Sequence, residues 1–99
     1  MISRSKYPEA AQHIDDNSPV TGRIDRPGAS DRRRESLRGI ETTPGMDRDE
    51  VPPAVLSTGG AGASVRHIPS SDNRGAGSSM GQQMRDLPNG TLVSIISGD

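Results

Sequence analysis

The feature that most constrains the fold of this chain is a pair of short strand patterns separated by a glycine-rich segment. Residues 51–56 and 63–68 are mostly apolar or alternate apolar with polar side chains, which is typical of strands. Residues 57–62 between them are rich in glycine, which tolerates the backbone angles of a tight reversal. The two segments are therefore expected to pair as an antiparallel hairpin.

A helix pattern follows the second strand. Residues 70–73 are polar and of the types that cap helices, and residues 74–87 place Met80, Met84 and Leu87 at helical spacing. Two strands and a helix in immediate succession predict a small unit in which these three apolar side chains face the core.

The rest of the chain predicts further helices and strands around this unit. The expected elements are a helix over 9–16 behind Pro8, a strand over 20–25, a helix over 31–38 between Ser30 and Gly39, and a strand over 91–96. The expected fold class is α+β, with a short antiparallel sheet and helices in one domain of residues 1–99. Residues 1–5 are expected to form a flexible N-terminus.

The composition permits only a thin core. Hydrophobic residues make up 28% of the chain, Tyr7 is the sole aromatic residue, and cysteine is absent, so no disulfide contributes. So few apolar side chains are typical of disordered proteins, but a formal net charge of -1 is not. We expect a marginally stable aliphatic core that gains stability from a bound metal, partner or substrate. Its expected members include Ile14, Val20, Ile24, Leu37, Ile40, Val55, Leu56, Val65, Ile68, Met80, Met84, Leu87, Leu92, Val93, Ile95 and Ile96.

No segment is apolar over a length that spans a membrane, since the longest apolar runs cover only residues 51–56 and 92–96. The first residues carry positive charge but no apolar stretch, so a secretory signal peptide is not expected. We therefore expect a protein without membrane contact.

Three runs in the second half of the chain carry a family pattern. Asp-Arg-Asp-Glu lies at 47–50, a glycine-rich turn leads into a strand at 59–65, and Ser-Asp-Asn-Arg-Gly-Ala-Gly lies at 71–77. In this order and spacing they resemble the NucA/NucB-type deoxyribonucleases, the bacterial DNA-entry and secreted sporulation nucleases. Weaker similarities in the first half extend the resemblance over nearly the whole chain.

The resemblance implies a ββα-metal-finger-like core and a metal-dependent, sequence-tolerant endonuclease that hydrolyses DNA phosphodiester bonds. It implies Asp49 as the general base and Arg48 as a contact to the scissile phosphate. Glu50 is expected to orient the attacking water, to bind the metal, or to be the base itself, and these alternatives stay open. Asp47 is left outside the catalytic set. His13 and His67 are left outside it too, because a lone histidine is more often structural.

The run at 71–77 is expected to bind the metal. A neutral carbonyl oxygen from Asn73 suits a largely hydrated Mg²⁺ or Mn²⁺ ion, and Asp72 is expected to contribute a carboxylate to the same ion. Arg74 is a further expected phosphate contact, and Gln82 is expected to hydrogen-bond beside the site. Asp72 and Asn73 are also ordinary capping residues, so the metal role follows from the full run rather than from these two residues alone.

A basic cluster on the helix expected over 31–38 is a candidate DNA contact. Arg32, Arg33 and Arg34 are consecutive, and cationic side chains supply most sequence-independent affinity for DNA. A solvated helix face is an equally good explanation, because neighbouring acidic residues partly neutralise the cluster. The net charge of -1 means that any electropositive groove is local.

Three departures from the family pattern leave other functions open. Val51 replaces a usual tryptophan, the cysteines of some relatives are missing, and Gln82 stands where relatives often have histidine or asparagine. The alternatives are a catalytically decayed nuclease-like module that binds DNA or an inhibitor, and a largely disordered basic linker. As an active enzyme, the protein is expected to be a monomer that acts on DNA outside the producing cell. It is then either secreted or a toxin held by an inhibitor or immunity protein, and a cytoplasmic location is the alternative.

Overall fold

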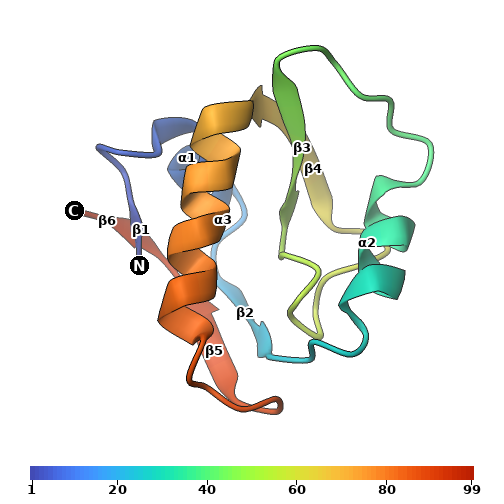
Figure 1. Cartoon of the computed structure of the whole chain (residues 1–99), viewed down its shortest axis with the longest axis vertical. Coiled ribbons are helices and arrows are strands. Elements are labelled where there is room, and N and C mark those ends of the chain that lie inside the picture. The colour runs from blue at the N-terminus through green and yellow to red at the C-terminus, as the bar shows by residue number, and fades with distance from the viewer.

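The computed structural model describes residues 1–99 and contains three helices and six short strands (Figure 1). None of the helices combines the length and the apolar character needed to cross a membrane. The predicted α+β class is confirmed. In chain order the elements are β1 (Ile2–Ser3), α1 (Pro8–Asp16), β2 (Val20–Arg23), α2 (Ala29–Leu37), β3 (Met46–Val51), β4 (Ser64–Pro69), α3 (Ser70–Met84), β5 (Leu92–Ile95) and β6 (Ser97–Gly98).

The strands pair two by two rather than in one sheet. β1 runs parallel to β6, and β2 runs antiparallel to β5. β3 and β4 form the longest pair, an antiparallel ladder that joins Met46 to Pro69 at one end and Val51 to Ser64 at the other. In Figure 1 this hairpin stands between α3 and α2.

The hairpin begins five residues earlier than the sequence pattern predicts. The expected first strand covers 51–56, whereas β3 spans Met46–Val51, residues 52–55 contain a bend and a turn, and Leu56 forms an isolated antiparallel bridge with Ile24. Pro52 and Pro53 have no amide hydrogen to donate, so the ladder ends at Val51. The first strand therefore consists of the charged run itself.

The helices follow the sequence pattern, with shifts at two starting points. α1 begins at Pro8 as expected, while Gly28 rather than Ser30 precedes α2. α3 begins at Ser70, directly after β4, rather than near Arg74. The polar residues expected to cap α3 thus lie inside its first turn, where they contact other elements.

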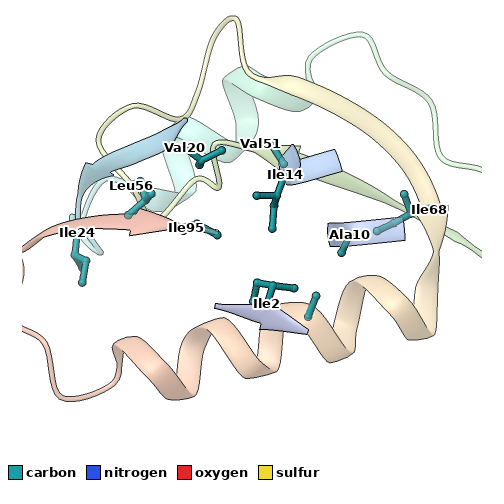
Figure 2. Close-up of a cluster of buried hydrophobic side chains, with 10 residues drawn as sticks. Ile2, Ala10, Ile14, Val20, Ile24, Val51, Leu56, Ile68 and Ile95 are labelled. Atoms are coloured by element: carbon teal, nitrogen blue, oxygen red, sulfur yellow. The ribbon is translucent and has the colours of Figure 1, made fainter. Parts of the chain in front are cut away.

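The core is small and aliphatic, as the composition predicts. A cluster of ten buried side chains gathers between α3 and the strands (Figure 2). Met80, Met84 and Leu87 pack against this cluster but are only partly buried. The ten members are Ile2, Ala10, Ile14, Val20, Ile24, Val51, Leu56, Ile68, Ala76 and Ile95.

Two expectations about the ends of the chain are wrong. Ile2 is 1% exposed and its amide donates to the carbonyl of Ile96, so residues 1–5 hold a strand rather than a flexible N-terminus. Leu92 and Ile96 are 63% and 58% exposed rather than part of the core. Alternation along β5 turns Ile95 inward and leaves Leu92 outside, and Ile96 directly follows the strand.

The sole aromatic ring joins α1 to α3. Tyr7 precedes α1, and a Cβ atom built on Gly75 would lie 2.3 Å from a carbon of the Tyr7 ring. The ring therefore packs directly on the backbone of α3, where only glycine leaves room. Gly75, in the middle of the run at 71–77, thus has a packing role.

Candidate active site

The acidic side chains of β3 each reach a different helix. Successive side chains on a strand point to opposite faces, so Asp47 and Asp49 share one face and Glu50 lies on the other. Asp47 contacts α3, Asp49 contacts α1 and Glu50 contacts α2. The central position of β3 in Figure 1 allows all three contacts.

Asp49 is bonded to a buried histidine of α1. His13 is fully buried, its Nδ1 lies 2.8 Å from Oδ2 of Asp49, and its Nε2 lies 2.8 Å from Oγ of Ser64. Because a carboxylate only accepts hydrogen bonds, Nδ1 donates to Asp49, and in the neutral ring Nε2 accepts from the Ser64 hydroxyl. Oδ1 of Asp49 has no hydrogen-bond partner in the protein. The imidazole therefore fixes one carboxylate oxygen and leaves the other available.

Glu50 has both carboxylate oxygens engaged. Oγ of Ser36 donates to Oε2 at 2.6 Å, and Nε of Arg33 lies 3.6 Å from Oε1. The Glu50 side chain is only 10% exposed, and Ser36 is buried. Glu50 thus ties α2 to the strand and is less free than Asp49 to accept a proton.

Asp47, which the sequence pattern leaves outside the site, organises the start of α3. Its carboxylate accepts from the Ser70 hydroxyl at 2.8 Å, from Nδ2 of Asn73 at 3.1 Å and from the Arg74 guanidinium at 3.1 and 3.3 Å. The hydrogen bond from Asn73, followed by those from Arg74 and Ser70, lowers the pKa of Asp47 from its ordinary 3.8 to about 2. Because Asp47 holds the amide nitrogen of Asn73, the carbonyl oxygen Oδ1 stays free for another partner.

A cleft of about 430 Å³ brings these residues together. Its walls come mainly from α1, α2, β3 and α3, with one residue each from β2 and β5, and include no residue of β4, so the cleft lies along the unpaired edge of β3. Half of the predicted site residues line it, and the other half lie outside. Those in the cleft are Arg33, Arg48, Asp49, Glu50 and Asn73.

The carboxylate of Asp72 caps α1 and does not line the cleft. Its two carboxylate oxygens accept the backbone amides of Glu9 and Ala10 at 3.0 and 3.1 Å, at the N-terminus of α1. Amides in the first turn of a helix have no partner within the helix, and a carboxylate there also interacts favourably with the helix dipole. Because both oxygens are used in this way, we remove Asp72 from the expected metal ligands.

The three arginines of the basic cluster on α2 each lie in a different environment. Arg32 donates to the carboxylate and the carbonyl of Asp25, so it ties α2 to the end of β2. Arg34 pairs with Asp31 on the surface, as the solvated-face explanation predicts. Only Arg33 reaches the cleft.

The remaining predicted contacts differ in how far they are free to bind a ligand. Arg74 is held by Asp47, although its side chain is 76% exposed. Arg48 donates to the carbonyl of Ile40 at 2.9 Å and has no carboxylate partner. Gln82 is exposed and bonds within its own helix. Arg48 is therefore the cationic side chain best placed for a phosphate.

His13, Ser64 and Asp47 are the site residues that the sequence pattern misses. For His13 a signal exists, because helical spacing places it on the same buried face as Ala10 and Ile14. A polar ring on a buried face requires a hydrogen-bond partner, so the sequence predicts that His13 has one but does not identify the residue. No comparable local signal links Asp47 to a helix that begins more than twenty residues later.

The oxygens left free in the cleft suit a hydrated divalent ion. No cluster of three or more His, Asp or Glu side chains that could hold a metal is present. Oδ1 of Asn73 and Oδ1 of Asp49 are the free oxygens identified above. Mg²⁺ usually keeps several of its waters and takes only one or two ligands from the protein, so these donors fit an ion of that type.

The pKa of Asp47 predicts how stability changes in acid. A carboxyl group whose pKa is lower in the folded than in the unfolded protein stabilises the fold above its unfolded pKa, and that contribution disappears as pH falls towards the folded pKa. We expect the free energy of unfolding, measured with denaturant, to fall more steeply between pH 4 and 2 in the wild type than in Asp47→Asn.

Two other carboxyl groups provide the internal reference. Hydrogen bonds, first from Gln12 and from the backbone of Ser5 respectively, lower the pKa values of Asp16 and Asp99. Both contributions are common to the two proteins and cancel in the difference. Parallel stability curves for wild type and Asp47→Asn would contradict the assigned role of Asp47.

Comparison with known proteins identifies the family of this chain. The model of the family described as deoxyribonuclease NucA/NucB matches residues 2–96, which include β3 and all of α3. The DNA-entry nuclease of Bacillus subtilis (strain 168) is 48% identical to this chain over 93 residues. That match covers 89% of this chain and 63% of the relative, so the chain spans less than two thirds of the relative's length. The chain belongs to the deoxyribonuclease NucA/NucB family.

Proposed function

We propose that this protein is a divalent-metal-dependent endonuclease that hydrolyses DNA phosphodiester bonds in the cleft along β3. The observation that carries the proposal is the arrangement of Asp49, which has one carboxylate oxygen held by buried His13 and the other free. Asn73 and Arg48 line the same cleft and suit a metal ion and a phosphate. Membership of a deoxyribonuclease family supports DNA as the substrate.

Asp49 is the proposed general base. Hydrolysis of a phosphodiester requires a water to lose a proton as it attacks the phosphorus atom. In this proposal Oδ1 of Asp49 accepts that proton, while the hydrogen bond from His13 to Oδ2 fixes the orientation of the carboxylate. Glu50 is the weaker choice, because both of its oxygens have partners within the protein.

Asn73 is the proposed metal ligand. The hydrogen bond from its amide nitrogen to Asp47 orients its carbonyl oxygen, so Asp47 acts as a positioning residue. A bound Mg²⁺ or Mn²⁺ supplies positive charge where negative charge accumulates on the phosphate during attack. Oδ1 of Asp49 is the other free oxygen in the cleft and suits a hydrogen bond from a water of the same ion.

Recognition of the sugar-phosphate backbone is the proposed mode of DNA binding. Arg48 has no carboxylate partner and is the proposed contact to the scissile phosphate. Tyr7, the only aromatic residue, packs on Gly75, so no aromatic ring is available to stack on bases. Contacts to the backbone alone carry little sequence information, so cleavage should be tolerant of sequence and sensitive to salt.

The departures from the family pattern lie outside the proposed chemistry. Val51 is 4% exposed within the core cluster, so replacement of the usual tryptophan alters packing. Gln82 bonds only within α3. Both observations favour an active enzyme over a decayed module. The name of the Bacillus subtilis relative, a DNA-entry nuclease, supports action on DNA outside the cytoplasm of the producing cell.

Plasmid cleavage tests the proposal. With Mg²⁺ or Mn²⁺ the protein should convert supercoiled plasmid to nicked and linear forms, and a chelator should stop the reaction. Asp49→Asn keeps the shape of the side chain but removes the base, so its rate should fall by about 10²-fold or more. Asn73→Ala should also lose activity and should require a higher metal concentration.

A matched control changes another aspartate in the same way. Asp31→Asn alters an exposed residue of α2 that lies outside the cleft, and it should cut like the wild type. Cleavage by Asp49→Asn at the wild-type rate would remove Asp49 from the role of base. A wild-type protein that cuts with neither metal would favour the non-catalytic DNA-binding module.

Two substitutions of His13 separate its two hydrogen bonds. In His13→Asn the side-chain amide takes the place of Nδ1 and keeps the bond to Asp49, whereas in His13→Gln it reaches the place of Nε2 and keeps the bond to Ser64. A misplaced catalytic group costs up to about 10²-fold in rate, so kcat should fall much further in His13→Gln than in His13→Asn. The KM for DNA should change in neither.

Thermal unfolding of both variants serves as the control for folding, because each loses one buried hydrogen bond. If kcat falls in proportion to the loss of stability, by the same relation in both variants, His13 has only a structural role and does not position Asp49.

A further inference from the structure

A second groove continues from the active cleft along α3. Its volume is about 450 Å³, and its walls come from α3, from α2 and from the segment that follows β3. The groove and the cleft share part of their lining and are therefore contiguous, so an extended ligand in one can continue into the other. The residues common to both are Arg33, Pro53, Ala54, Gly77 and Met80.

Three arginines line this second groove, and two of them have no carboxylate partner. Arg26 donates only to neutral oxygens around the C-terminal end of α3. Arg33 pairs with Glu50, its Nε lying 3.6 Å from Oε1, although its side chain is 63% exposed. The Arg85 side chain is exposed and makes no hydrogen bond or ion pair with the protein. The groove therefore carries positive charge that the protein itself does not neutralise.

Most arginines of the chain are neutralised by an ion pair. In a chain with a formal net charge of -1, this pairing leaves the groove as a local concentration of free cations beside the active cleft. Such charge binds phosphate groups, and releases their counterions, wherever the ligand can approach closely. The paired arginines are Arg4, Arg32, Arg33, Arg34, Arg38, Arg66 and Arg74, which leaves Arg26 and Arg85 as the free cations of the groove.

The surface of α3 leaves room for such an approach. Gly77 and Gly81 line the groove, and a Cβ atom built on either residue would meet no other atom within 4 Å. The two glycines are one helical turn apart, so they expose a strip of helix backbone between Arg33 and Arg85. A sugar-phosphate chain can lie along this strip without displacing a side chain.

We propose that this groove binds the DNA backbone that flanks the cleavage site, with Arg33, Arg85 and Arg26 as its phosphate contacts. The inference rests on the proposed function, because the active cleft supplies the point from which the strand continues. Arg85 is twelve residues beyond Asn73 along α3 and its C-terminal cap, a distance of about 18 Å at roughly 1.5 Å per residue. This length matches about five nucleotides at roughly 3.4 Å each.

Arg85 is the residue to change, because Arg26 also holds the end of α3. Each phosphate contact contributes roughly 0.9 to the slope of log affinity against log salt concentration, which is about eightfold in affinity at 0.1 M salt. For Arg85→Gln we expect the KM for a 20-base-pair duplex to rise by about this factor and the salt slope to become shallower by about 0.9. Because Arg85 lies far from the reacting phosphate, kcat should not change.

Arg66→Gln is the matched control, since it removes the same charge from β4, which contributes to neither groove. Its KM, salt slope and kcat should equal those of the wild type. If Arg85→Gln behaves like Arg66→Gln, the proposed groove is wrong. A fall in kcat at unchanged KM would also overturn it, because that result assigns Arg85 to the chemical step.

A binding measurement keeps this inference separate from the proposed activity. Fluorescence anisotropy of the labelled duplex, recorded in the presence of chelator, should give the same eightfold difference between wild type and Arg85→Gln at 0.1 M salt. If wild type cuts no DNA, the proposed function fails, and this binding difference still decides the groove. If wild type cuts DNA and the two proteins bind the duplex equally, only the groove fails.

Discussion

Hydrogen bonds from the helices to the carboxylates of β3 are the interactions on which the rest of this structure depends. A strand made of Asp, Arg, Asp and Glu packs among helices only if each charged group finds a partner, because an unpaired buried charge is costly. His13, Ser36 and Asn73 supply those partners from α1, α2 and α3. No buried side-chain nitrogen or oxygen lacks a hydrogen bond. The strand that carries the proposed chemistry therefore also sets the positions of all three helices.

In this arrangement the neighbouring carboxylates of β3 have different roles. Asp47 and Glu50 have both oxygens engaged, so they orient α3 and α2. Asp49 has one oxygen engaged and one free, which is the state that a general base requires. The thin aliphatic core behind them supplies apolar burial but no aromatic packing apart from Tyr7. In such a protein a change at the site should affect stability as well as activity, and the matched variants above separate the two.

Local patterns predict the three helices and most strands, because proline, glycine and apolar spacing act within a few residues. The features that these local patterns miss depend on contacts between residues far apart in the sequence. The sequence pattern misplaces β3 because the apolar residues at 52–56 look more like a strand than the charged run, whose partners lie on three separate helices. It does not predict that Asp72 caps α1, because the two amides that this residue accepts lie 63 and 62 positions earlier. It does bring Arg48, Asp49 and Asn73 to one cleft, because the resemblance to a nuclease family carries long-range information that periodicity lacks.

The most direct test of the proposed metal site is an amide NMR spectrum recorded during titration with paramagnetic Mn²⁺, which broadens signals from nearby nuclei. The side-chain amide of Asn73 and the backbone amide of Asp49 should broaden first, and Asn73→Ala should remove this selective effect. Broadening centred instead on another acidic part of the surface, such as Asp15 and Asp16, with the Asn73 signals still sharp, would contradict the proposed metal site.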